Sequence, residues 1–274
     1  MKNLLHNIEI LAMVALLMVG IQSCADNGEE ANLVEVNFTA TLPANAQSRA
    51  FGNGKQVNTL VVGIFNEQKI EIERKWYPMN GTSANICLTL TQGQTYHFIF
   101  WAYNNSQNIY DISNLKSITM NTQPNPITFA QAEAMDAFFA VKDIVTVMGD
   151  RNHTIELLRP LAQINVGTTE QPTQASFMVK SVSQTFFPFT NSVSEPTMNY
   201  TWSFNETTNE KFSVEGQDFN YLAMGYLFAP VSAKSVVTEL ILTDDKGKSK
   251  KVEFPPVEIK ANNRTNIAGS FTVN

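Results

Sequence analysis

The sequence predicts an all-β protein built from two tandem Ig-like β-sandwich domains. Short segments in which apolar and polar residues alternate recur along most of its 274 residues, and this period of two is typical of strands with one buried face. Only the stretch from Thr128 to Ala140, rich in Ala, Gln, Glu and Met, has the composition of a helix, and its end is strand-like again. A polar, turn-like break at 148–152 separates two series of strands and predicts a domain boundary near residue 150.

The N-terminal sandwich is predicted at residues 33–150. Its first strand, 34–42, has an unbroken apolar face, made of Val34, Val36, Phe38, Ala40 and Leu42. Further strands are predicted at 57–65, 86–90 and 95–103. The last of these is aromatic on both faces, which suits the middle of a sandwich. Asn80-Gly81 and Gln92-Gly93 are turn signals between the strands.

The C-terminal sandwich is predicted at residues 151–274. Its strands are expected at 154–166, 176–187, 221–228, 235–243, 250–260 and 267–273. The run Asp244-Asp245-Lys246-Gly247 predicts a hairpin between two of them. Pro160, Pro255 and Pro256 are expected at strand ends or edges, because proline has no N–H to give to a ladder.

Residues 1–23 are predicted to be a lipoprotein signal peptide. Lys2 supplies a positive start, and the apolar run 10–20 is too short to cross a membrane, which takes roughly 20 residues. The run Ile21-Gln22-Ser23-Cys24 resembles the lipobox of bacterial lipoproteins, although Gln22 is unusual there. Cys24 is therefore predicted to be the acylated first residue of the mature protein. The alternative is a plain signal peptide with an incidental cysteine.

A lipid on Cys24 would hold the protein at a membrane, because two or more acyl chains anchor stably. Residues 24–32 then form an acidic tether, which resembles the signals that send some lipoproteins to the outside of the outer membrane. The simpler interpretation is a flexible linker. We expect a surface-exposed lipoprotein of the cell outer membrane.

Composition argues against several classes of function. The net charge is −6 and no long run of Lys or Arg appears, so nucleic acid is a poor partner. If Cys24 carries lipid, Cys87 has no disulfide partner. His97 and His153 lie outside any ligand-spaced cluster, so neither a metal nor a cofactor is expected.

No catalytic motif is present, and we interpret the chain as a non-enzyme. Cys87 lies in a strand pattern and is expected to be a buried, inert thiol. Trp76-Tyr77 beside a turn and Trp202 in a polar region are candidate ligand-binding aromatics, since exposed aromatic rings stack on sugars and anchor interfaces. Core packing is the competing interpretation of these three residues and the one we favour.

Three sets of sequence motifs bear on the family of the protein. The first is Ser48-Arg49-Ala50-Phe51-Gly52-Asn53-Gly54 followed by the strand 57–66. The second is 93–102 together with Asp136-Ala137-Phe138-Phe139-Ala140, and the third is 158–166 together with 263–270. In this order, and with the lipobox, they resemble the fimbrillin family, the lipoprotein-borne subunits of type V pili, over essentially the whole chain.

The resemblance implies two transthyretin-like sandwiches and a maturation step. In the family a trypsin-like protease cuts after an arginine in the loop that follows the first strand, and the matching bond here joins Arg49 to Ala50. Loss of that strand opens an apolar groove, which a strand of a neighbouring subunit fills. The alternative for Arg49 is an ordinary surface arginine.

One departure concerns the donor strand. Polymerising members carry it in a C-terminal extension, whereas this chain ends at Asn274, directly after the strand 267–273. The chain is therefore expected either to accept a strand without donating one or to swap its last strand. Tip, anchor and stalk positions in a pilus stay open, as does a related adhesin with a host or glycan receptor. The rival hypothesis is a non-polymerising carbohydrate-binding surface lipoprotein.

Overall fold

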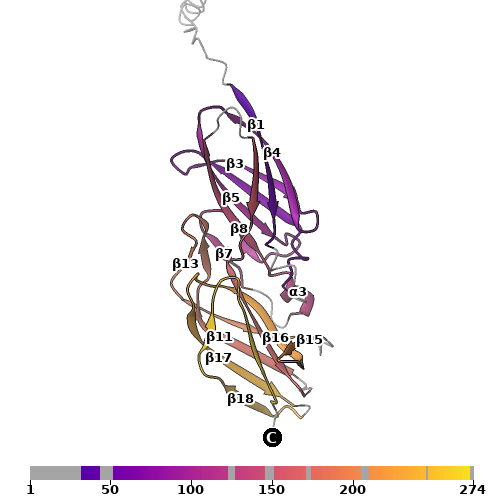
Figure 1. The fold of residues 1–274 in the computed structure, drawn as a ribbon. Helices are drawn as coiled ribbons and strands as arrows, with labels where there is room; N and C mark the ends of the chain where they lie inside the picture. Colours follow the sequence, from indigo (N-terminus) through magenta and orange to yellow (C-terminus); the bar gives the residue numbers. More distant parts are fainter. Residues whose placement is uncertain are drawn as a thin grey trace, which may run out of the picture. The chain divides into compact units, whose positions relative to one another are not determined.

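The computed structural model describes residues 32–43, 52–122, 127–145, 151–170, 174–204, 210–244 and 246–271. The chain divides into two units, Met1–Leu33 and Val34–Asn274, and almost all of the described residues belong to the second. That unit consists of strands grouped in five sheets, with one short α-helix and one 3-10 turn in the described residues. The predicted all-β sandwich fold is confirmed (Figure 1).

Two sheets form the first sandwich. One has the order β4-β1-β9, with β4 at Ser83–Thr91, β1 at Leu33–Thr41 and β9 at Asn152–Glu156. The other has the order β3-β2-β5-β8, with β3 at Glu71–Pro78, β2 at Thr59–Phe65, β5 at Thr95–Tyr103 and β8 at Phe138–Val145. One cluster of buried apolar side chains joins the inner faces of the two sheets. The β5 strand has the central position that its aromatic residues predict, between β2 and β8.

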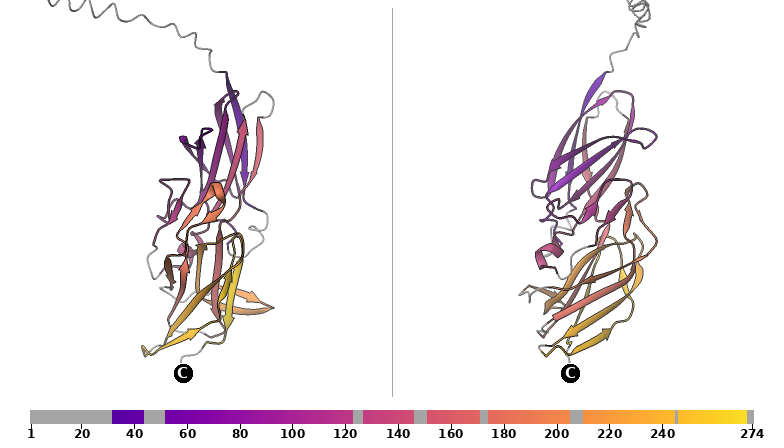
Figure 2. Two further views of the ribbon diagram at one scale, coloured as in Figure 1. Left: turned by 90° about the vertical axis from the view of Figure 1, so that its left-hand side faces the viewer. Right: turned by 180° about the vertical axis from the view of Figure 1, so that it is seen from behind.

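Two further sheets form the second sandwich. One has the order β15-β16-β10-β20, at Lys211–Val214, Gln217–Phe228, Leu161–Thr168 and Arg264–Gly269. The other has the order β14-β11-β17-β18, at Met198–Trp202, Gln174–Val182, Lys234–Thr243 and Ser249–Glu253, and β19 at Val257–Ile259 also pairs with β17. The views in Figure 2 show these strands in pink through orange to yellow and most of the first sandwich in indigo to magenta.

A small sheet joins segments that are far apart in the sequence. Its order is β13-β12-β7-β6, at Ser192–Val193, Thr185–Phe187, Ile118–Met120 and Tyr110–Asp111. The 3-10 turn η1 at Pro188–Thr190 follows β12. Beneath this sheet, Phe186 stacks on Phe228 at 5.7 Å and lies 6.3 Å from Trp101, so β5, β12 and β16 contribute to one aromatic cluster.

The helix α3 is shorter than the helical composition suggests. It covers Phe129–Glu133 and begins with a capping box, in which the Thr128 hydroxyl accepts from the Gln131 amide and the Gln131 side chain accepts from the Thr128 amide. The chain returns to strand at Phe138, as predicted. None of the helices in the described part of the chain is long and apolar enough to span a membrane.

Three predicted strands are each split in two. The stretch 154–166 is β9 and β10, 176–187 is β11 and β12, and 250–260 is β18 and β19. Pro160, Pro255 and Pro256 lie between strands, as expected of residues that cannot donate to a ladder. The hairpin at 244–247 joins β17 to β18. The division into domains at residue 150 stays a prediction. The strand β9 begins after that residue, yet it pairs with β1 of the first sandwich.

Candidate functional site

The first strand, β1, lies in the middle of its sheet, between β4 and β9. It runs parallel to β9, with Phe38 opposite His153 and Thr41 opposite Glu156. Its apolar face is at most 4% exposed over the residues Val34, Val36, Phe38, Ala40 and Leu42. The alternation read from the sequence therefore corresponds to one buried face and one outer face, as a period of two requires.

Phe38 is the largest anchor of this strand. Its ring lies 5.1 Å from that of Phe98 and 5.5 Å from that of Phe100, and it stacks on His153 at 5.1 Å. The next residue, Thr39, points to the outer face, where its hydroxyl donates to the Asn85 side chain at 3.3 Å. Aromatic contacts of this kind add to the free energy of simple area burial.

Backbone hydrogen bonds hold β1 beyond the ladders of its sheet. The Asn37 amide donates to the Arg151 carbonyl at 2.6 Å, and the Leu157 amide donates to the Thr41 carbonyl at 2.8 Å. The Leu42 amide donates to the Thr82 carbonyl at 2.8 Å. Removal of β1 would leave these groups unpaired and would open an apolar channel between β4 and β9.

A buried polar cluster holds the chain where it resumes at Gly52. The Gly52 amide donates to Glu133 Oε2 at 3.1 Å, and its carbonyl accepts from Arg159 Nη2. Gly52 has φ +70°, and a Cβ here would lie 2.7 Å from Gln163 Oε1 and 2.9 Å from the Tyr226 hydroxyl. Only glycine fits this socket, since any side chain would be strained and would clash.

Arg159 and Asp136 form the charged centre of the cluster. Arg159 Nε and Nη2 donate to the two Asp136 oxygens at 2.7 Å each, and the side chains are 1% and 2% exposed. The guanidinium also lies 4.7 Å from the Phe138 ring centre and donates from Nη1 to Asn262 at 3.4 Å. Burial acts to lower the pKa of Arg159, but the charge and hydrogen bonds of Asp136 outweigh it, so the pKa is raised and Arg159 stays charged.

Glu133 is the second buried carboxyl of the cluster. Burial raises its pKa to about 7, and the charge of Asp136 adds to this, against lowering by the Gly52 amide, Arg159 and Tyr226. Among the described residues, Glu133 Oε1, Gln163 Oε1 and the Tyr226 hydroxyl have no hydrogen-bond partner. Burial keeps the pKa of Tyr226 well above its ordinary value, so this hydroxyl keeps its proton.

The three sets of motifs named above meet in this cluster. Gly52 belongs to the first set, Asp136 to the second, and Arg159 and Gln163 to the third. We did not single out Arg159, Asp136 or Glu133 as site residues from the sequence. The signal that could have found them is a lone Arg and two acidic residues inside otherwise apolar stretches, because buried charges require partners.

The aromatic candidates fall into two environments. Trp76 is 57% exposed on β3, the edge strand of its sheet, and Ile72 on the same strand is 54% exposed. Tyr77 is half-buried against the core of the first sandwich, and its hydroxyl donates to the Cys87 carbonyl at 3.3 Å. Burial raises the pKa of Tyr77 above its ordinary value.

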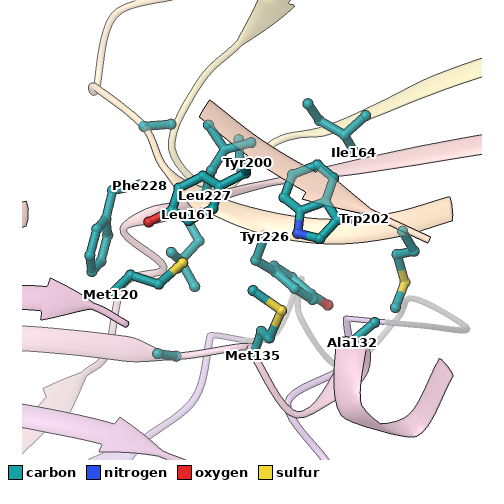
Figure 3. Close-up of a cluster of buried hydrophobic side chains, with 14 of the residues drawn as sticks. Met120, Ala132, Met135, Leu161, Ile164, Tyr200, Trp202, Tyr226, Leu227 and Phe228 are labelled. Carbon is teal, nitrogen blue, oxygen red and sulfur yellow. The ribbon is translucent and has the colours of Figure 1, made fainter. Parts of the chain in front are cut away.

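Trp202 is 3% exposed and belongs to the core of the second sandwich. Figure 3 shows its indole among Ile164, Tyr200 and Tyr226. A Cβ on Gly225 would come within 2.2 Å of this indole, so the missing side chain at 225 is what admits it. At this position the indole packs in the core and presents no open face for a ligand.

The cysteine prediction is wrong for Cys87. This thiol is exposed on β4, because the period of two that buries Ile86 and Leu88 turns Cys87 to the outer face. His97 bonds to Asp143 at 2.7 Å on the sheet surface. The described residues contain no group of three or more His, Cys, Asp or Glu side chains placed to hold a metal ion.

Cys24, Arg49 and Ala50 lie outside the described residues. Their predicted roles as lipid carrier and cleavage site therefore stay predictions. The nearest described positions are Pro43 at one side of the Arg49 segment and Gly52 at the other. The chain is held before this segment by β1 and after it by the hydrogen bonds of Gly52.

A family model matches residues 27–274; the family, DUF6562, is described as being of unknown function. None of the curated proteins matches the chain. Among solved structures, a candidate adhesin from Bacteroides ovatus is similar, with a TM-score of 0.54, 12% identity, and coverage of 81% of this chain and 78% of that one. This similarity shows a shared fold.

Two further solved structures are similar. Candidate polysaccharide binding proteins of DUF1812 from Bacteroides thetaiotaomicron match with a TM-score of 0.50 and 11% identity, over 80% of each chain. The tip fimbrial protein Mfa3 from Porphyromonas gingivalis matches with a TM-score of 0.45 and 14% identity, over 82% of each chain.

Proposed function

Since the chain belongs to DUF6562, a family of unknown function, and shares its fold with a candidate adhesin, we propose a role on the cell surface. It is a lipoprotein of fimbrillin type, a tip or anchor subunit of a pilus or a related adhesin. Its partners are other fimbrillin-like subunits, joined by β-strand addition, and the role is not enzymatic. The resemblance of its motifs to fimbrillins supports this proposal.

The placement of β1 carries the proposal. A central strand with a wholly buried apolar face lies directly before the segment that contains Arg49. If β1 left the sandwich, its apolar contacts would be exposed to water at about 25 cal/mol per Å². A few hundred Å² of such surface is a driving force of several kcal/mol for a strand of another subunit to enter.

In this proposal the N-terminal segment determines where the protein is delivered. Acylated Cys24 carries the protein to the outer membrane, and the acidic residues 24–32 present it on the outside. Cleavage of the bond between Arg49 and Ala50 separates the lipid from the rest of the chain. Without cleavage, the lipid is permanent and the protein stays at the membrane as a base or an adhesin.

Limited digestion of the purified precursor with an arginine-specific protease tests the maturation step. We expect a first cut that yields a fragment beginning at Ala50, read by N-terminal sequencing, and no such fragment from Arg49→Ala. Arg74 is an internal reference, because its place in strand β3 and its ion pair with Glu71 protect the bond after it while the protein stays folded. First cuts elsewhere, with Arg49 intact, would remove the maturation step from the proposal.

A second candidate function is carbohydrate binding without polymerisation. The exposed ring of Trp76 on an edge strand favours it, as does the fold shared with candidate polysaccharide binding proteins. On a glycan array, Trp76→Ala and Tyr77→Ala should then lose binding, whereas Ile72→Ala, an exposed apolar neighbour on the same strand, should keep it. Equal binding by all three variants would exclude these aromatics as the site.

A further inference from the structure

The strand β3 is a sheet edge that carries much of the exposed apolar surface. Among the described residues, seven large apolar side chains are exposed, and three of them, Ile70, Ile72 and Trp76, lie in one short stretch. Each of these three is more than half exposed. Within the described strands β3 pairs with β2 alone, which leaves the backbone groups of every second residue without a strand partner there.

The charges of β3 cancel within the strand. Arg74 bonds to Glu71 through Nε at 2.5 Å and Nη2 at 2.8 Å, and its Nη1 donates to the Ile112 carbonyl at 2.6 Å. Lys75 Nζ lies 3.2 Å from Glu73 Oε1. Edge strands are commonly protected from other strands by charges, lysine above all. The acids and bases of β3 neutralise each other, so an approaching strand meets no net charge on this edge of a protein whose net charge is −6.

The side chains of β3 are divided between the two faces of its sheet. Arg74 and Trp76 lie on one face and Glu73 and Lys75 on the other, as their pairing with successive residues of β2 requires. A register shift at Ile72 marks a bulge, which ends this regular stretch. A further strand that continues the sheet must keep its faces. It can therefore pair only in registers that place residues of the same face opposite each other.

We propose that β3 pairs with β3 of a second copy of this protein, in antiparallel orientation about a two-fold axis at Arg74. In this register Glu73 of each copy lies opposite Lys75 of the other, and Trp76 is level with Ile72 of the other copy. The two Arg74 side chains meet at the axis, where each is already neutralised within its own copy. The neighbouring allowed registers, two residues away, place Glu73 opposite Glu73 or Lys75 opposite Lys75. Charge therefore selects the register.

This interface goes beyond strand addition at β1. It uses the other sheet of the first sandwich, removes no strand and does not depend on cleavage after Arg49. The ladder is short and each end of it brings one tryptophan and one isoleucine together. It is thus smaller than a stable interface, which buries about 1,200 to 2,000 Å². We therefore expect a transient dimer, with a dissociation constant of about 1 μM or weaker.

Sedimentation velocity of the full-length chain in a mild detergent is the first measurement. The changes Cys24→Ser and Cys87→Ser, made in every variant, exclude pairs linked by a disulfide. The parent chain should pass from monomer to dimer as its concentration rises. Glu73→Lys and Lys75→Glu should each weaken the association by about tenfold or more, because each places like charges opposite each other at two points of the ladder.

The two charge reversals also test the register. Mixed in equal amounts, Glu73→Lys and Lys75→Glu should form a heterodimer, because each changed position then faces the opposite charge. The double variant with both changes should associate like the parent for the same reason. Glu258→Lys, a charge reversal at an exposed position of the second sandwich, is the matched control and should also behave like the parent. If the mixture and the double variant stay monomeric, or if both single variants associate as the parent does, the proposal is wrong.

Quenching of tryptophan fluorescence by acrylamide is the second measurement. Trp101 and Trp202 are buried, so the ring that acrylamide reaches is Trp76. Quenching should decrease over the concentrations at which the parent forms its dimer, and it should stay constant in Glu73→Lys. Constant quenching in the parent would overturn the proposal. Protection of Trp76 that appears only when a glycan is added to a monomeric chain would also overturn it, and would favour the carbohydrate-binding candidate.

Discussion

At the scale of single residues, the buried charges next to Gly52 determine most of what can be predicted. Arg159 and Asp136 are almost completely shielded from water, and they form an ion pair with each other. Removing one partner of such a pair leaves an uncompensated buried charge, which typically costs about 3 to 5 kcal/mol. Exposed ion pairs contribute little, with a median of about 0 to 1 kcal/mol.

Arg159→Met should therefore lower the free energy of unfolding by about 3 to 5 kcal/mol, since Asp136 is left alone in the core. Lys180→Met, which breaks the partly exposed pair with Glu239 and leaves Glu239 paired with Lys251, is the matched control and should cost about 1 kcal/mol or less. Urea unfolding followed by circular dichroism measures both. A loss from Arg159→Met no larger than that of the control would contradict the prediction.

Glu133 predicts a pH dependence of the uncut chain. Its folded pKa of about 7 lies above the ordinary value of 4.5, so the folded state binds more protons than the unfolded state between these two values. The contribution of Glu133 to the free energy of unfolding is complete below about pH 4.5. It falls as the pH rises towards 7, by at most about 1.4 kcal/mol per pH unit. In Glu133→Gln this fall in stability with pH should be absent when the urea unfolding midpoint is measured across the same pH range. If the midpoints of the two proteins changed with pH in the same way, the prediction would be refuted.

Trp202 illustrates what the sequence could not reveal at this scale. The alternation in Tyr200-Thr201-Trp202 places both aromatics on one face of a strand. Whether that face is buried depends on Gly225, which is distant in sequence and leaves room for the indole. For Arg159 likewise, the partner Asp136 lies on another segment, and no local pattern joins them.

At the scale of elements, β1 is the strand whose loss the proposed maturation requires, and Phe38 is its largest buried side chain. Phe38→Ala should lower the free energy of unfolding by about 3 to 5 kcal/mol, because it empties a site lined by Phe98, Phe100 and His153. Thr39→Ala, on the exposed face, should change it by about 0.5 kcal/mol or less. Thermal unfolding compares the two, and similar losses would mean that β1 is not anchored by its buried face.

Strands with clean alternation were predictable from the sequence, as β1, β4 and β17 show. The edge strand β3 was missed, because its polar and apolar residues follow no period and most of them face solvent. Long apolar stretches hid the breaks within them. The run at 154–166 reads as one strand, yet it breaks after β9: Leu158 makes an isolated bridge to Phe139, and Arg159 pairs with Asp136.

At the scale of the whole described unit, the two sandwiches share structure. The β7 strand of the earlier series pairs with β12 of the later one, and Trp101 and Phe186 lie in the same apolar cluster as Phe228. Contacts of this extent favour a single cooperative transition. Domain organisation was predictable only as two series of strands, since the pairing of β7 with β12 depends on contacts between residues 66 positions apart.

Hydrogen exchange can test this cooperativity. The amides of Ile99 in β5 and Leu240 in β17, both fully buried, should exchange with the same free energy of opening. Phe186→Ala should lower both values together, by about 3 kcal/mol or more. If only the second sandwich responds, the two parts unfold independently, and the shared cluster does not couple them.

The parallel pairing of β1 with β9 also has a consequence for the order in which the chain folds. Asn37 pairs with Asn152, so a strand near the N-terminus waits for a partner more than 100 residues later in the sequence. Pairings this distant form slowly, because the loop must close before the contact is made. During synthesis, where the N-terminus emerges first, β1 acquires its β9 neighbour only after most of the first sandwich has appeared. Late docking would leave the groove open for a time in every newly made molecule.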